Sequence, residues 1–291
     1  MTAPNFGSPT TALCRLLVYA GLTLSLMPVQ FLAVTFRWPL RKSLPNWYHQ
    51  RSCRILGIQI ETHGSPSPHH PTLFVANHIS YFDIEVLGSL LKTSFVAKSE
   101  VAKWPFFSWL AKLQETVFVE RRGRRAAEHR DEISRRLDDG DALVLFAEGT
   151  SGDGHAVLGF KSALFSVAER RPHGEALTVQ PVSIAYTRLD GMPLGRYLRP
   201  FFAWYGDMEL GSHLWHAISL GRVTVVVEFH EPVTIDQFGS RKALSDYCCA
   251  VVSRGVVAAL SGRSPAALPA PSEAPVAPEA EAREMARLKA G

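Results

Sequence analysis

The 291-residue sequence predicts an α/β fold: a mainly parallel central sheet flanked by helices, with an apolar N-terminal helix that associates with a membrane. Two observations and one general rule support this prediction. Short runs of β-branched and apolar residues alternate with helical patterns between residues 55 and 262. Strands that are separated by helices usually pair in parallel and are covered on both faces. An uncharged apolar stretch lies close to the N-terminus.

Residues 1–54 form the predicted membrane-associating segment. Leu16–Phe36 contains no charged residue, and a helix needs about 20 apolar residues to cross a bilayer. The stretch ends in Phe-Arg-Trp-Pro, which is unlike the small residues of a signal-peptide cleavage site. Basic residues are more frequent after the stretch than before it, which predicts the inner (cytoplasmic) membrane with the remaining chain facing the cytoplasm. Pro28 and Gln30 also permit a bent helix that lies in the interface, so both arrangements stay open.

Residues 55–262 form the predicted globular domain, in which strands and helices alternate. The predicted strands are Ile58–Thr62, Thr72–Ala76, Ser94–Ala97, Thr116–Glu120, Ala142–Phe146, Thr178–Tyr186 and Val223–Phe229. The predicted helices are Tyr81–Lys92, Lys103–Leu113, Arg125–Asp139, Lys161–Arg170 and Arg241–Leu260.

The clearest of these elements rest on periodicity. Thr116–Glu120 alternates in polarity as a strand does, and Val223–Phe229 contains consecutive valines typical of a buried strand. Arg125–Asp139 carries paired charges at helical spacing. Arg241–Leu260 repeats apolar residues every three or four positions, which predicts a helix with a buried face.

The C-terminal tail is predicted to carry no fold, and the composition and motifs of the chain exclude several classes of function. Residues 263–291 are rich in Ala, Pro and Glu and are predicted to be disordered. A net charge of +4 suits an anionic membrane surface or an acidic carrier, but it is too small to indicate nucleic acid. The four cysteines form no CxxC pair, which indicates reduced thiols and no metal site. No GxGxxG opens a βαβ unit, so no dinucleotide cofactor is expected.

Residues 77–83, Asn-His-Ile-Ser-Tyr-Phe-Asp, are the most informative stretch. They follow an apolar strand and open a helical pattern, so we expect Ser80 to cap the helix and Asp83 to lie in its first turn. The intervening turn can then bring the His78 imidazole against the Asp83 carboxylate. Such a contact fixes the tautomer and leaves the other ring nitrogen free to take a proton from a hydroxyl. The residues alone also permit a structural role, in which His78 bonds within the loop and Asp83 interacts with the helix dipole.

This motif resembles the first motif of the glycerolipid acyltransferase family, typified by 1-acylglycerol-3-phosphate acyltransferases. Three further stretches resemble the other motifs of that family and occur in the same order: residues 117–122 (VFVERR), 146–150 (FAEGT) and 180–182 (QPV). Phe160 and Lys161 also suit the short segment that follows the third motif. The resemblance covers the globular domain and does not include the tail.

The resemblance implies a one-step transfer of a fatty acyl group from a thioester to the hydroxyl of a lyso-lipid, without a covalent acyl-enzyme. His78 would be the general base and Asp83 would orient it. The residues that we expect to bind or position the acceptor are Asn77, Ser80, Arg121, Glu148, Gly149, Thr150 and Lys161. No cofactor or metal is implied, and the co-substrate would be acyl-carrier protein or acyl-coenzyme A.

Two departures from the family pattern concern the acceptor. The third motif usually reads FPEGTR, with the arginine assigned to the acceptor phosphate, but here Ala147 replaces the proline and Ser151 replaces the arginine. The run FAEGTSGDG and the aromatic stretch at 203–208 are more similar to the branch that acylates lyso-ornithine lipid, whose head group is a zwitterionic amino acid. Asp153 could meet the amine of that head group. Lyso-ornithine lipid is therefore the expected acceptor; the alternatives are a phosphatidic-acid-forming acyltransferase, a thioesterase and a catalytically silent lipid-binding protein.

Overall fold

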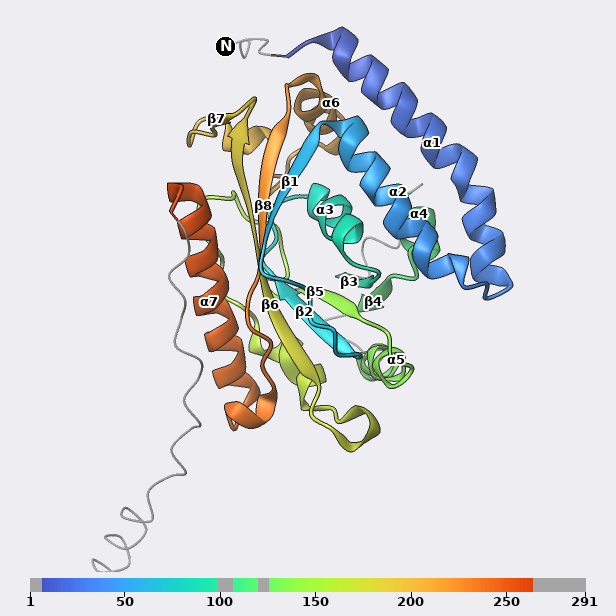
Figure 1. Cartoon of the computed structure of the whole chain (residues 1–291), viewed down its shortest axis with the longest axis vertical. Coiled ribbons are helices and arrows are strands. Elements are labelled where there is room, and N and C mark those ends of the chain that lie inside the picture. Colours follow the sequence, from blue (N-terminus) through green and yellow to red (C-terminus); the bar gives the residue numbers. More distant parts are fainter. Residues whose placement is uncertain (1–6, 99–106, 120–125, 264–291) are drawn as a thin grey trace, which may run out of the picture.

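The computed structural model describes residues 7–98, 107–119 and 126–263, and it shows one sheet with helices on both faces (Figure 1). In chain order the strands are β1 (Ile58–His63), β2 (Thr72–Ala76), β3 (Ser94–Lys98), β4 (Val117–Val119), β5 (Leu143–Phe146), β6 (Thr178–Leu189), β7 (Met192–Pro193) and β8 (Val223–Phe229). The helices are α1 (Pro9–Thr35), α2 (Leu40–Leu56), α3 (Phe82–Leu90), α4 (Phe107–Leu113), α5 (Ala126–Asp138), α6 (Leu210–Ser219) and α7 (Arg241–Ser261). Short 3₁₀ helices include η2 (Ser162–Glu169) and η4 (Arg199–Phe201).

The strand order is β1-β8-β6-β2-β5-β3-β4, with β7 paired to β6. Strands β6, β2, β5, β3 and β4 run parallel, whereas β8 is antiparallel to β6 and parallel to β1. The prediction of a mainly parallel sheet flanked by helices is therefore confirmed. Because neighbouring strands run parallel, their carboxyl ends share one edge, which is where such sheets place ligands.

Two apolar clusters cover the two faces of the sheet. Along β2, Leu73 and Val75 point to a cluster that includes residues of α5, η2 and α7, whereas Phe74 and Ala76 point to the cluster built with α2, α3 and α6. This alternation follows from the two-residue period of a strand. Figure 1 shows α7 on one side of the sheet and α2 with α3 on the other.

The N-terminal helix α1 is fastened to the globular domain by polar side chains. The Arg15 guanidinium donates hydrogen bonds to backbone carbonyls at the end of α6 and just after it, those of Ile218, Leu220 and Gly221. Gln30 is buried, and its side-chain amide donates to the carbonyls of Arg41, at 3.0 Å, and Leu113, at 2.8 Å. Arg15 and Gln30 therefore face protein.

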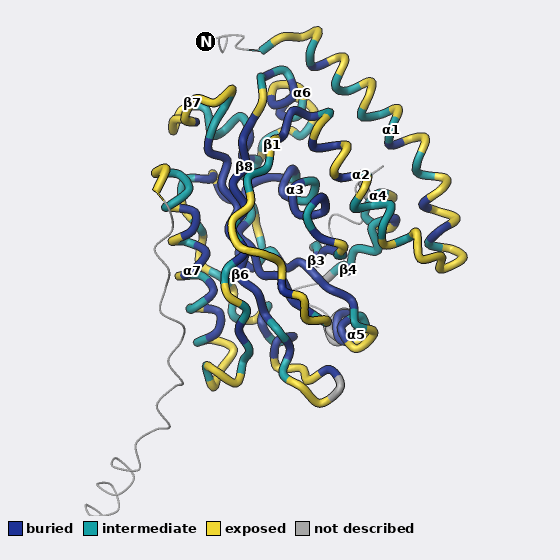
Figure 2. The backbone as a smooth tube through the Cα atoms, in the orientation of Figure 1, coloured by how far each residue is buried: buried dark blue, intermediate teal, exposed yellow. Residues whose placement is uncertain are grey.

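Helices α1 and α7 are both long and apolar enough to cross a membrane. Helix α7 packs on β6 and buries Leu244, Cys248 and Val252, as a core helix does. Helix α1 leaves many of its large apolar residues exposed, and Figure 2 shows exposed positions recurring along its length.

The structure departs from the sequence prediction at several elements. Helix α2 was not predicted, because Pro45 and several basic residues interrupt any apolar pattern there. The predicted helix Lys161–Arg170 is the 3₁₀ helix η2. The prediction that Ser80 caps α3 is wrong: the N-cap is Tyr81, and no side chain bonds to the first turn as a cap. Residues 103–106, 120–125 and the tail from 264 lie outside the described residues.

Candidate active site

His78 lies in the loop between β2 and α3, at the edge of the sheet where the carboxyl ends of the parallel strands meet. The strand β2 ends at Ala76 and the helix begins at Phe82, so the intervening loop can turn back on itself. This is the position in a parallel sheet that best presents a loop side chain to a ligand.

The loop brings His78 and Asp83 together, as the sequence predicts. The His78 Nδ1 lies 2.9 Å from the Asp83 Oδ2. Asp83 is fully buried, whereas 21% of the His78 side chain remains exposed. Because Nδ1 donates its proton to the carboxylate, Nε2 carries the lone pair of a neutral imidazole. Within the described residues Nε2 has no hydrogen-bond partner, so it is available to a ligand.

Several further donors fix the Asp83 carboxylate. Its Oδ2 accepts hydrogen bonds from the backbone N–H groups of Ile79, at 2.6 Å, and Ser80, at 2.9 Å. Its Oδ1 accepts from the Tyr186 hydroxyl at 2.8 Å. Burial, together with the Asp83 charge, raises the pKa of Tyr186 well above its usual value, so the phenol keeps its proton and remains a donor. The carboxylate is therefore held in the position that orients His78.

An aromatic side chain supports the other face of the His78 ring. Phe146, the last residue of β5, stacks on the imidazole with ring centroids 4.1 Å apart and an interplanar angle of 20°. Phe146 and Tyr186 were not among the expected site residues. They lie near the carboxyl-terminal parts of the two strands that flank β2, and Tyr186 is the one aromatic residue of β6; these are the signals that point to them.

Glu148 and Gly152 hold the backbone of His78 from the loop that follows β5. The Glu148 Oε1 accepts from the His78 N–H at 3.0 Å, and its Oε2 accepts from the Leu158 N–H at 3.2 Å. The Gly152 N–H donates to the His78 carbonyl at 2.9 Å. Burial raises the pKa of Glu148 to about 8, against the opposing effect of the two N–H groups. The described contacts of Glu148 therefore position the His78 loop.

Asn77 and Ser80 are buried beside His78 and differ in their bonding. The Asn77 side chain bonds to the backbone of Ile184 in both directions, at 3.0 and 2.8 Å, and so ties the end of β2 to β6. The Ser80 hydroxyl is fully buried and has no hydrogen-bond partner among the described residues. The capping role that we expected of Ser80 is absent because its hydroxyl accepts no backbone N–H of the first turn, although the Asp83 carboxylate accepts from the Ser80 N–H.

The remaining predicted residues surround the same loop at greater exposure. Gly149 closes the turn after β5 with φ of +67°, a conformation that favours glycine, and its N–H donates to the Phe146 carbonyl at 3.0 Å. Thr150 and Lys161 have exposed side chains, and the Lys161 N–H donates to the Ala147 carbonyl. Arg121 lies outside the described residues. Among the residues described, no group of three or more His, Cys, Asp or Glu side chains could hold a metal ion.

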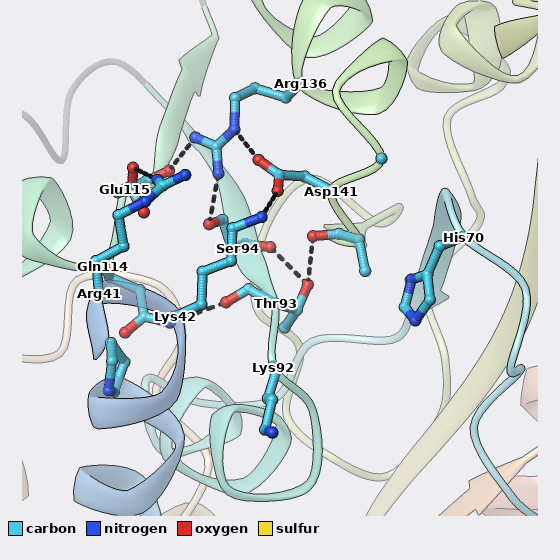
Figure 3. Close-up of a pocket in the computed structure, with 13 residues that line it drawn as sticks. Arg41, Lys42, His70, Lys92, Thr93, Ser94, Gln114, Glu115, Arg136 and Asp141 are labelled. Atoms are coloured by element: carbon cyan, nitrogen blue, oxygen red, sulfur yellow. Dashed lines mark hydrogen bonds and ion pairs between the residues drawn. The ribbon is translucent and has the colours of Figure 1, made fainter. Parts of the chain in front are cut away.

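A polar pocket of about 230 Å³ lies at the opposite edge of the sheet, near the amino ends of β3 and β5 (Figure 3). The Asp141 carboxylate pairs there with Lys42 and Arg136, and Arg41 pairs with Glu115. Burial alone would raise the pKa of Asp141, but the hydrogen bonds and charges of its two cationic partners lower it. These ion pairs fasten the start of α2 to the sheet, far from His78 along the strands.

Comparison with known proteins gives consistent matches. The model of the acyltransferase family matches residues 59–185. A lyso-ornithine lipid O-acyltransferase of Brucella abortus is 47% identical over 77% of this chain and 86% of its own length. One of Rhizobium meliloti is 41% identical over 90% of this chain and 91% of its own. A 1-acyl-sn-glycerol-3-phosphate acyltransferase of Neisseria meningitidis is 30% identical over 66% of this chain and 71% of its own.

The same fold occurs in a solved structure. The crystal structure of the 1-acyl-sn-glycerophosphate acyltransferase of Thermotoga maritima superimposes with a TM-score of 0.59 at 23% identity, covering 84% of this chain and 96% of that one.

Proposed function

The chain belongs to the acyltransferase family, and from this premise we propose that it moves a fatty acyl group from a thioester to the hydroxyl of lyso-ornithine lipid. The observation that carries the chemistry is the contact of 2.9 Å between His78 and Asp83, with the other imidazole nitrogen open to a ligand. The matches to lyso-ornithine lipid O-acyltransferases over most of both chains support the acceptor.

In the proposed reaction the His78 Nε2 takes the proton of the acceptor hydroxyl. The resulting oxygen nucleophile attacks the thioester carbonyl, the tetrahedral intermediate expels the thiolate, and the thiolate takes the proton back from the imidazolium. Asp83 stabilises the imidazolium and keeps its ring oriented, while Phe146 supports the ring from one face. The new ester bond replaces the thioester bond, and neither a cofactor nor an acyl-enzyme is required.

The loop after β5 supports a zwitterionic acceptor. Position 151 holds the half-buried Ser151, so this loop presents no cation there to a phosphate. An acceptor with a phosphomonoester would need a cation of this kind, because charge-assisted hydrogen bonds dominate phosphate recognition. The matches at about 30% identity to 1-acyl-sn-glycerol-3-phosphate acyltransferases keep the phosphate acceptor as the second candidate.

Membrane association through α1 is part of the same proposal. One side of the helix packs on the globular domain, whereas the other exposes Leu17, Leu24 and Phe31, at 62%, 60% and 50%. A helix that contacts protein on one side and presents apolar residues on the other suits the interface of a bilayer, where the lyso-lipid and its product reside. We propose that the domain lies on the cytoplasmic side, where acyl-carrier protein or acyl-coenzyme A supplies the thioester.

An acceptor panel tests the proposal. The purified protein in detergent is given one acyl thioester with lyso-ornithine lipid, lysophosphatidic acid or lysophosphatidylglycerol, and both the acylated lipid and the free fatty acid are quantified. We expect acylated lyso-ornithine lipid to form fastest. Preference for lysophosphatidic acid would establish the second candidate, and fatty acid release without acceptor would identify a thioesterase.

A further inference from the structure

A cluster of charged and polar side chains lies next to the His78 loop and has no part in the proposed proton transfer. Two segments far apart in the sequence build it: the loop after β5, with Asp153 and His155, and the short helix η4, with Arg199. These residues are the carboxylate, imidazole and guanidinium groups that a polar head group would meet there.

Backbone contacts place both segments against the His78 loop. The Gly152 N–H donates to the His78 carbonyl at 2.9 Å, and the Trp204 N–H donates to the Ile79 carbonyl at 2.9 Å. Gly154 fits closely between them, since a Cβ at this position would lie 3.2 Å from the Ile79 side chain and 3.9 Å from that of Ala203. The neighbours of Gly152, Gly154 and Trp204 in the chain therefore lie beside the candidate general base.

The polar groups of this cluster are incompletely bonded. The Arg199 Nε is buried and has no hydrogen-bond partner among the described residues, and the same is true of both ring nitrogens of His155. The His155 Nδ1 lies 3.4 Å from the Asp153 Oδ2 without forming a hydrogen bond. Buried donors without partners are rare in proteins and need an explanation, and a bound ligand is one.

The charges of the cluster are opposite and close enough to interact. Burial and the neighbouring Arg196 lower the pKa of Arg199, and Asp153 acts against them. Half of the Asp153 side chain is exposed, so its carboxylate is accessible to a ligand as well as to His155. A site with one anion and one cation fits a head group that carries both charges.

We propose that Arg199 and Asp153 form the head-group subsite of the acceptor, in which the guanidinium binds the carboxylate and the Asp153 carboxylate binds the ammonium of a zwitterionic amino-acid head group. This inference rests on the proposed function, because it assumes that His78 acts on the hydroxyl of the same acceptor. His155 supplies a further hydrogen bond to the bound carboxylate through a ring nitrogen that is buried and unpartnered in the described structure.

The subsite also explains selection against a phosphate acceptor. A phosphomonoester carries only negative charge, so Asp153 repels it while Arg199 attracts it. In a zwitterionic head group the ammonium is attracted to Asp153, and the carboxylate is still attracted to Arg199. Discrimination then comes from a repulsive element as much as from an attractive one.

The experiment measures kcat and KM for lyso-ornithine lipid and for lysophosphatidic acid, with the same acyl thioester, in wild type, Asp153→Asn and Arg199→Gln. Asp153→Asn should raise KM for lyso-ornithine lipid about tenfold with kcat nearly unchanged, because it removes one charge-assisted contact to the head group. The same substitution should leave KM for lysophosphatidic acid unchanged or lower it. Arg199→Gln should raise KM for lyso-ornithine lipid by a similar factor, and Arg199→Lys should recover part of the loss.

Arg196→Gln is the matched control. It removes an equal positive charge, which an exposed side chain carries three positions before Arg199. An equal effect of Arg196→Gln would show that only the general positive potential matters and would overturn the subsite. Unchanged KM values in Asp153→Asn and Arg199→Gln, with melting temperatures like wild type, would overturn it as well. If wild type fails to acylate lyso-ornithine lipid at all, the proposed function is wrong, which is a separate result from failure of the subsite.

Discussion

Asp83 determines what His78 can do. Its two oxygens accept hydrogen bonds from the His78 ring, two backbone N–H groups and the Tyr186 hydroxyl. These donors fix the position of the buried carboxylate. The orientation and the tautomer of the His78 ring therefore depend on this one side chain.

Substitutions at Asp83 and Tyr186 separate the effect of the carboxylate charge from the effect of the hydrogen bonds that hold the carboxylate in position. Asp83→Asn keeps the size and one oxygen acceptor but removes the charge that stabilises the imidazolium, so we expect kcat to fall by about 10²–10⁴-fold. Tyr186→Phe is the control, because it removes one donor and leaves the charge; its kcat should fall by less than about tenfold, with a lower melting temperature. Rates of acyl transfer at saturating substrates check both. Equal losses in the two variants would contradict the role of the charge.

Glu148 should make stability depend on pH. Its pKa is about 8 in the folded protein, above its ordinary value of 4.5, so between these two values the folded state retains a proton that the unfolded state releases. Because the pKa is raised in the folded state, the contribution of the protonated Glu148 carboxyl to folding stability is fully present below pH 4.5. This contribution is lost as the pH rises through 8. Melting temperatures of wild type and Glu148→Gln between pH 5 and pH 9 test this. Wild type should lose stability relative to the variant as the pH rises, and parallel curves would exclude the effect.

Among the helices, α2 holds α3, which carries Asp83, in place. The buried His49 of α2 bonds through Nδ1 to Glu85 of α3, at 2.7 Å, and through Nε2 to the Gln114 side chain, at 3.0 Å. Burial alone would lower the pKa of His49, but the Glu85 charge and the two hydrogen bonds raise it. Glu85 also accepts from Tyr19 of α1 at 2.9 Å, and it lies two residues after Asp83.

The contact between α2 and α3 requires the glycine at position 88. A Cβ there would lie 2.4 Å from the His49 Cδ2, so Gly88→Ala should destabilise the fold by roughly 1–3 kcal/mol although alanine favours helices. In a His49→Ala background the same substitution should be neutral or stabilising. Unfolding free energies of the four proteins of this cycle provide the measurement. An equal cost of Gly88→Ala in both backgrounds would refute the contact.

These helices also show how far the sequence predicts the fold. The strands other than β7, and α5, were predictable because each carries a local period, and the His78–Asp83 contact was predictable because both residues lie in one turn. Helix α2 was not, since its buried residues include the polar His49 and Ser52, and the partners of His49 are distant in the chain. Tyr186 was missed because it is 103 residues from Asp83 in the chain, so only the pairing of β6 with β2 brings the two together.

The whole molecule must bring a soluble thioester and a membrane lipid to one site for the proposed reaction. The sheet presents the His78 loop at its carboxyl edge, and α1 presents apolar side chains to solvent on another surface. The apolar surface of α1 is continuous with exposed Phe36 and Trp38, whose rings stack at 5.8 Å. Aromatic side chains of this kind favour the membrane interface.

Charges on the exposed side of α1 should therefore weaken membrane binding. The double substitution Leu17→Glu and Leu24→Glu should reduce partition into phospholipid vesicles by at least about tenfold, because each buried leucine contributes on the order of 1.5–3 kcal/mol. Val257→Glu is the matched control: Val257 is 60% exposed on α7, the other apolar helix. Cosedimentation with vesicles measures both. A loss caused only by Val257→Glu would assign the membrane contact to α7.

The most direct test concerns the imidazole itself. Wild type and His78→Ala, each in lipid vesicles, are given an acyl thioester and lyso-ornithine lipid, and released thiol and acylated lipid are measured together. The structure predicts that both products fall by at least about 10²-fold in His78→Ala, with a melting temperature within a few degrees of wild type. Acyl transfer by His78→Ala at a rate near that of wild type would contradict the proposed mechanism.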